Sequence, residues 1–141
     1  FEPLQWRTDS IQDESELHRR LVDLLPGADV FLALPDRVAF NPRTAQNVLL
    51  TTYRYRVPVI AFSPGYVQAG ALAAVYSTPR QIGAQTAVLL DRLVRGASAG
   101  TIQTPGEFSV AINVQVARSL GLTPLPENEV HERLKAQEGS R

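Results

Sequence analysis

Three apolar runs of strand length recur along the chain, and each is followed by a segment with helical periodicity. The runs cover residues 28–34, 57–62 and 71–76. A strand with one face in solvent alternates apolar and polar residues, whereas a continuous apolar run is typical of a strand covered on both faces. The pattern therefore predicts an α/β fold, a three-layer Rossmann-like arrangement around a mostly parallel sheet.

The helix starts are marked by a capping side chain followed by proline. Asn41-Pro42 predicts a helix that runs to about Arg54, and Thr78-Pro79 predicts one that ends near Gly96. Alternation predicts a short strand at residues 4–8 and another at 108–113. Helical spacing predicts a helix over residues 11–25 and a short one after Asn113. Residues 124–141 are polar, and a frayed helix and a disordered tail are both compatible with them.

The predicted core joins the apolar runs to one face of each helix. We expect Val59 at its centre, so that an aspartate there would bury an unpaired carboxylate. The strand residues expected to be buried are Val30, Leu32, Val57, Val59, Ile60, Leu72 and Ala74, and the helix residues packing on them are Leu21, Leu49, Leu89 and Leu90.

Composition excludes several classes of function. The chain has 141 residues, with 14 Lys plus Arg, 14 Asp plus Glu and no cysteine. Without net positive charge, nucleic-acid binding is not expected. Without cysteine, there is no disulfide, thiolate metal site or cysteine nucleophile. The apolar runs are far shorter than the roughly 20 residues of a transmembrane helix, so no membrane span is expected.

No pattern indicates catalysis or a cofactor. His18 lies among arginines and His131 in the polar tail, and both are expected to be solvated surface residues. Neither forms a metal site or a catalytic pair. Glycine-rich phosphate-binding motifs are absent from the sequence, so no nucleotide cofactor is indicated. The protein is therefore predicted not to be an enzyme and to need no cofactor or metal.

Candidate ligand-binding residues follow the predicted strands, because ligands bind beyond the carboxyl ends of strands in open α/β sheets. Each candidate also has a purely structural interpretation. Asp36 could simply form a turn, and Ser63 and Tyr66 could belong to a Pro-Gly turn with an exposed ring. Tyr76 and Thr78 could belong to an ordinary helix cap. Together the candidates could hold a flat organic ligand: Asp36, Ser63, Tyr66, Tyr76 and Thr78.

Two blocks of sequence then indicate a family. They are V-Q-A-G-A-L-A-A-V-Y at residues 67–76, and F-S-V-A-I-N with A-R-S-L-G-L at residues 108–122. With the apolar runs in their order, they resemble the substrate-binding proteins of ABC transporters whose best-known members bind aromatic amino acids. The resemblance implies the two-lobed type I periplasmic-binding-protein fold. At about half a member's length, residues 1–123 look like the carboxyl-terminal lobe and residues 124–141 like a polar tail.

The resemblance implies a solute-binding component that captures a small organic molecule between two lobes and passes it to a membrane permease. A sensory domain that reports ligand to a partner protein is the alternative, and the effector lobe of a repressor is a third reading. The expected location is periplasmic or extracytoplasmic. Because the chain begins at Phe1, we expect a mature or excised segment without its signal peptide.

The chain departs from that family at the site. Amino-acid-binding members carry acidic residues where this chain has Ser63, Gly65 and Thr78, which leaves Asp36 as the carboxylate of the strand-end loops. The departure argues against an α-amino-acid clamp and leaves a neutral ligand or no ligand. A lobe without its first strand also exposes a sheet edge, so the fragment is expected to self-associate.

Overall fold

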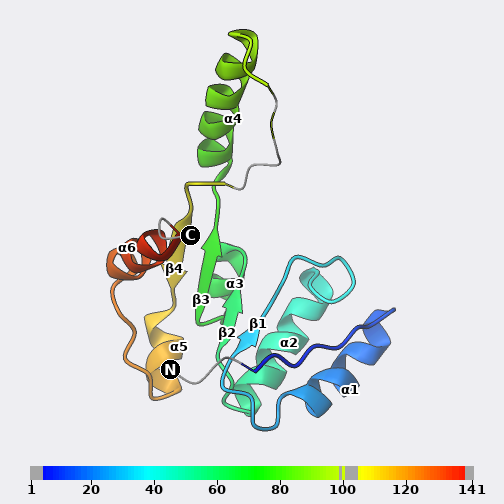
Figure 1. The fold of residues 1–141 in the computed structure, drawn as a ribbon. Coiled ribbons are helices and arrows are strands. Elements are labelled where there is room, and N and C mark those ends of the chain that lie inside the picture. The colour runs from blue at the N-terminus through cyan, green and yellow to red at the C-terminus, as the bar shows by residue number, and fades with distance from the viewer. Residues whose placement is uncertain (1–4, 99, 101–104, 139–141) are drawn as a thin grey trace.

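The computed structural model describes residues 5–98, 100 and 105–138, and its centre is a four-stranded sheet (Figure 1). The strands are β1 (Phe31–Leu32), β2 (Val59–Ala61), β3 (Ala73–Tyr76) and β4 (Ser109–Ile112). They lie in the order β1-β2-β3-β4, with β1, β2 and β3 parallel and β4 antiparallel to β3. The predicted α/β class with a mostly parallel sheet is confirmed.

Three helices lie on one side of the sheet and enclose the core, and the first of them packs on the second. They are α1 (Glu14–Leu24), α2 (Pro42–Arg54) and α3 (Pro64–Ala69). Asn41 caps α2 as predicted, through a reciprocal pair of hydrogen bonds with Thr44. The first helix starts later than predicted, because the side chain of Asp13 accepts the Ser15 N–H and caps it there. The Ser15 hydroxyl also donates to the Asp13 carboxylate, and this bond together with that of the Ser15 N–H lowers the pKa of the exposed Asp13 carboxyl.

The core consists of two adjoining clusters of buried residues. In one, Val59, Ala61 and Ala74 of the strands pack against Leu49 and Val67 of the helices. In the other, α1 packs on α2 and on the start of β2. The buried hydroxyl of Thr52 donates to the carbonyl of Val48 at 2.8 Å, so it adds no unsatisfied polar group. The second cluster contains Leu17, Leu21, Leu25, Val48 and Val57.

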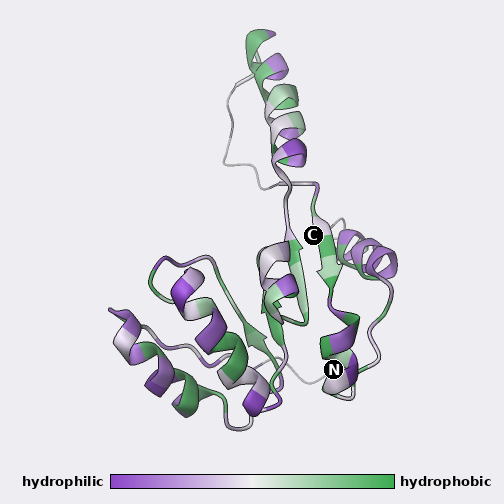
Figure 2. Ribbon diagram, turned by 180° about the vertical axis from the view of Figure 1, so that it is seen from behind, coloured by the Kyte–Doolittle hydropathy of each residue, from purple (hydrophilic) through white to green (hydrophobic). Residues whose placement is uncertain are grey.

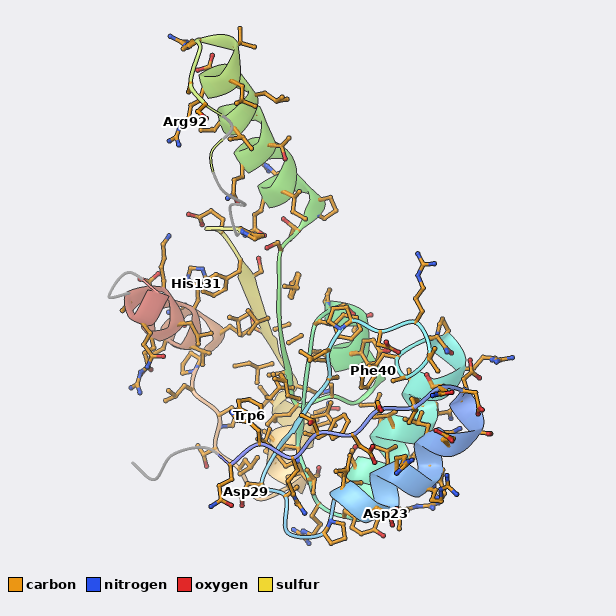
Figure 3. All side chains as sticks on the ribbon, turned by 45° about the vertical axis from the view of Figure 1, so that its right-hand side comes forward. Trp6, Asp23, Asp29, Phe40, Arg92 and His131 are labelled. Carbon is orange, nitrogen blue, oxygen red and sulfur yellow. The ribbon has the colours of Figure 1, made fainter. Side chains whose placement is uncertain are left out.

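The opposite face of the sheet is covered at β4 alone among the described strands. There α6 (Glu127–Glu138), which carries His131 (Figure 3), packs on β4. The ring centroids of Phe108 and His131 are 4.7 Å apart. His131 is half-buried, so its predicted place in solvent is wrong. The polar tail after residue 124 forms this helix, which is the first of the two alternatives for it.

Side chains of β1 show that the rest of this face is bare. Phe31 and Ala33 point to the helices, whereas Val30 is 49% exposed and Leu32 is 43% exposed. On β3, Ala74 is buried and Val75 is 41% exposed. The predicted burial of Val30 and Leu32 is wrong, because the described residues supply no helix over β1. The predicted burial of Val57, Val59 and Ala74 is confirmed, whereas Ile60 and Leu72 are half-buried.

Helix α4 (Pro79–Val94) projects from the body of the molecule beyond the end of β3 (Figure 1). Thr78 and Gln81 cap it reciprocally, as the Thr78-Pro79 pair predicts. None of its residues is buried, and hydrophobic residues recur along it (Figure 2). Among them, Ile82, Val88 and Val94 are exposed. The predicted packing of Leu89 and Leu90 on the sheet is therefore wrong: Leu89 is half-buried and Leu90 is 55% exposed.

This difference predicts unequal costs for two identical substitutions on amphipathic helices. Leu21→Ala should lower the free energy of unfolding by about 3 kcal/mol, because it leaves a cavity beneath α1. Leu90→Ala should change it by less than about 0.5 kcal/mol. Urea unfolding followed by circular dichroism measures both. Equal losses would mean that α4 packs on the body in solution.

The remaining segments are short or extended. Residues 5–10 form no strand, and Trp6 is 69% exposed (Figure 3), so the described part of the predicted first strand is wrong. Helix α5 (Val114–Ser119) follows β4, capped by Asn113 as predicted. No helix within the described ranges has the length and apolar character needed to cross a membrane.

Candidate ligand-binding site

The carboxyl ends of β1, β2 and β3 meet at one edge of the sheet, because the three strands are parallel. The loop at residues 33–41 follows β1, Phe62 and Ser63 follow β2, and Ser77 and Thr78 follow β3. Helix α4 leaves the body at the same edge (Figure 1). All five candidate residues therefore lie on or next to this carboxyl edge.

An aromatic cluster of Phe31, Phe40, Phe62 and Tyr66 occupies the edge at β1 and β2. The Phe62 and Tyr66 ring centroids are 5.0 Å apart, and Phe40 lies 6.2 Å from Phe62 and 6.5 Å from Tyr66. Figure 3 shows Phe40 in the loop before α2, next to α3. The four rings are half-buried. They pack on the core and still present aromatic surface, on which a flat ligand can stack.

Tyr66 gives this cluster a polar tip. Tyr66 lies in the first turn of α3, which starts at Pro64, and its ring contacts both Phe40 and Phe62. Partial burial raises the pKa of the Tyr66 hydroxyl, because desolvation penalises the phenolate. The hydroxyl therefore stays protonated at neutral pH and can donate a hydrogen bond.

Asp36 is committed to its own loop. One carboxylate oxygen, Oδ1, accepts the backbone N–H groups of Val38 at 2.8 Å and Ala39 at 2.7 Å. The Phe40 N–H donates to the Asp36 carbonyl at 3.0 Å and closes the turn. Asp36 thus stabilises the loop that carries Phe40, and this is the turn-forming role that the sequence left open. The other carboxylate oxygen, Oδ2, accepts no hydrogen bond from a described residue.

Ser63 and Thr78 differ although both precede a helix. The Ser63 side chain makes no capping hydrogen bond to α3, so its hydroxyl is available to a ligand. The Thr78 hydroxyl accepts the Gln81 N–H at 3.2 Å, and this is the ordinary helix cap. Tyr76 packs against the same buried cluster as Phe40, Phe62 and Tyr66. No described ring contact joins Tyr76 to the aromatic cluster.

Sequence reasoning missed the three phenylalanines of the aromatic cluster, Phe31, Phe40 and Phe62. Phe62 ends an apolar run directly before Ser63, and its strand-end position could have indicated it. Phe40 had no such signal. It precedes a helix cap, and it joins the edge because the Asp36 turn folds the loop back.

A separate groove of about 650 Å³ lies on the helical side, lined by residues of α2, α3 and α5 such as Leu49, Tyr53 and Val116. None of the five candidate residues lines it. Among the described residues, no group of three or more histidine and acidic side chains could hold a metal ion.

A parallel sheet with aromatic side chains at its carboxyl edge is typical of domains that bind small organic molecules. A family model described as ABC transporter substrate binding protein matches residues 4–133. The chain therefore belongs to the ABC transporter substrate-binding protein family, and membership supports a solute-binding role. No curated protein matches the sequence.

Solved structures show the same fold. A substrate-binding protein with adhesive properties from Clostridium difficile, in a ligand-free open structure, matches with a TM-score of 0.63 and 23% identity over 84% of this chain and 40% of its own. An ABC domain in complex with L-Trp from Streptococcus pneumonia matches with a TM-score of 0.59 and 18% identity, over 85% of this chain and 41% of its own.

A conserved domain protein from Vibrio cholerae matches with a TM-score of 0.59 and 22% identity, over 85% of this chain. The chain spans about two fifths of the length of these three structures.

Proposed function

We propose that the chain is the ligand-capturing part of an ABC-type uptake system. Outside the cytoplasm, it binds a small, flat organic solute at the carboxyl edge and does no covalent chemistry. It then delivers the solute to a membrane permease. The observation that carries the proposal is the aromatic cluster of Phe31, Phe40, Phe62 and Tyr66 at the edge where α/β sheets bind ligands. Family membership supports the solute-binding role.

The proposed site combines ring surface with polar groups. A planar ligand stacks on Phe40, Phe62 and Tyr66. The Ser63 and Tyr66 hydroxyls orient it, and Asp36 contributes mainly by holding the loop in place. Tyr76 and Thr78 lie at the carboxyl end of the next strand, β3, where the Thr78 hydroxyl caps the start of α4.

We further propose that residues 1–123 form one lobe of a two-lobed protein. Three surfaces support this. The outer edge of β1 has no partner strand among the described residues, the face carrying Leu32 and Val75 is bare, and α4 projects without packing. A strand beside β1, a helix over the bare face and a second body around α4 would fill them. The 40% coverage of the structural neighbours agrees with such a remainder.

This arrangement suggests how capture works. Helix α4 leaves the carboxyl edge after Thr78, and the chain comes back into the sheet at Phe108. The Ser77 hydroxyl donates to the Glu107 carbonyl at 3.0 Å and ties the two passes together. Two adjacent chain segments that connect two lobes can act as a hinge. When the lobes close about this hinge, they cover a ligand bound at the aromatic cluster.

A ligand screen tests the site. Small planar solutes at millimolar concentration should include one that raises the Tm of the chain, because a ligand that binds only the folded state stabilises it. Tyr66→Ala should abolish that shift, because it removes one ring of the cluster. Asp36→Ala should reduce it, because the loop that carries Phe40 loosens.

Tyr55→Ala is the matched control. Tyr55 is 41% exposed at the end of α2, far from the carboxyl edge, and its removal should leave the ligand-induced shift intact. A stabilising solute whose effect survives both Tyr66→Ala and Asp36→Ala would place the binding site elsewhere.

A further inference from the structure

Two cationic side chains at the carboxyl edge form no ion pair with a described residue. Arg37, in the loop after β1, and Arg80, at the start of α4, are exposed and make no ion pair or side-chain hydrogen bond with any described residue. Of the acidic groups nearby, Glu107 pairs with Lys135 at 3.2 Å. Asp36 uses Oδ1 to accept two backbone N–H groups of its own turn, and its Oδ2 accepts no hydrogen bond from a described residue.

Arg37 lies in the loop that carries Phe40, one of the four rings of the aromatic cluster. The Arg37 carbonyl accepts a hydrogen bond from the Asn41 side chain at 3.1 Å, and the Asp36–Phe40 hydrogen bond closes the turn around it. The loop therefore carries a free guanidinium three residues before the ring of Phe40. Arginine pairs with carboxylates through two parallel hydrogen bonds, and its plane suits a flat acid.

We propose that the site selects a planar aromatic acid, a ring that bears a carboxylate and no ammonium group. The ring stacks on Phe40, Phe62 and Tyr66, and the carboxylate meets the Arg37 guanidinium, with the Ser63 hydroxyl as a further donor. An α-ammonium group would meet Asp36 as the one carboxylate of the strand-end loops, and the Oδ1 of Asp36 already accepts two backbone N–H groups. The inference rests on the proposed function and names the class of solute for that site.

Three probes with one ring and different charge test the selection on the 141-residue chain. Benzoate, benzamide and benzylamine are titrated at neutral pH, and affinities are taken from ligand-observed NMR line broadening. Benzoate should bind most tightly, with about a threefold advantage over benzamide, as expected for an exposed ion pair. Benzylamine should bind most weakly.

Arg37→Gln should remove the advantage of benzoate over benzamide. Arg54→Gln is the control, because Arg54 is exposed at the opposite end of α2 from the site, and it should preserve the advantage. A preference for benzoate that survives Arg37→Gln, equal binding of all three probes, or tightest binding of benzylamine would each overturn the inference.

The same experiment separates this inference from the proposed function. If all three probes bind equally and Tyr66→Ala abolishes their binding, the aromatic site stands and selection by charge is wrong. If no probe binds, or if Tyr66→Ala leaves binding unchanged, the aromatic site itself is wrong.

Discussion

Val59→Asp should destabilise the folded chain by about 4 kcal/mol, because it places an unpaired carboxylate in the interior. Val59 is 4% exposed, lies at the centre of the sheet and packs in the cluster of Ala61, Ala74 and Leu49. Thermal unfolding followed by circular dichroism should show a Tm lower by more than about 10 °C, or no cooperative transition at all.

Val75→Asp is the matched control for this loss. It makes the same change on the neighbouring strand, but Val75 is 41% exposed on the bare face. Water reaches the new carboxylate there, and the expected cost is about 1 kcal/mol from the lower β-propensity of aspartate. If Val59→Asp melts like the parent chain, β2 is not the central buried strand.

The second large effect is self-association of the isolated chain. The N–H groups of Phe31 and Ala33 donate to the carbonyls of Pro58 and Ile60 on the neighbouring strand segment, so the intervening Leu32 N–H points to the open edge of β1. An unpaired edge next to apolar surface favours pairing with another chain, and zero formal net charge offers little repulsion. Light scattering should show the mean mass rising above the monomer value with concentration.

Leu32→Lys should shift the chain towards the monomer, because a charged edge residue opposes strand pairing. Val88→Lys makes the same type of change on α4, at a residue that is 54% exposed, and should leave association intact. A parent chain that stays monomeric at high concentration would show that the open edge does not pair.

Local signals predicted the elements well. Asn41-Pro42 and Thr78-Pro79 mark the starts of α2 and α4, because a capping side chain and a proline act through neighbouring backbone groups. The apolar runs located β1, β2 and β3 for a similar reason. In each case the energy that decides the structure lies within a few residues of the signal.

The burial of individual side chains was predicted less well, because the residues that would pack against them lie far away in the sequence or outside the described residues. An apolar run shows that both faces of a strand are hydrophobic, but not that the chain in hand covers both. Val59 is buried and Leu32 is exposed, although their runs look alike. Leu90 fits an amphipathic helix, and its partner is absent from the described residues.

The candidate site divides along the same line. Strand-end position predicted Ser63 and Tyr66 at the carboxyl edge. It could not predict that the Asp36 carboxylate would accept backbone N–H groups of its own turn, or that this turn would bring the Phe40 ring into contact with Tyr66. Those contacts depend on how two loops fold against each other, which residue spacing does not encode.

The two outer edges of the sheet are not equivalent. At β4, a carboxylate oxygen of Glu127 on α6 accepts the Ile112 N–H at 2.8 Å, so a side chain occupies the place of a further strand. At β1 no described residue does this. A chain with one closed edge and one open edge can pair strands with a single neighbour, and such pairing ends at two copies. Growth into an extended β-fibril, which needs two open edges, is blocked from the β4 side.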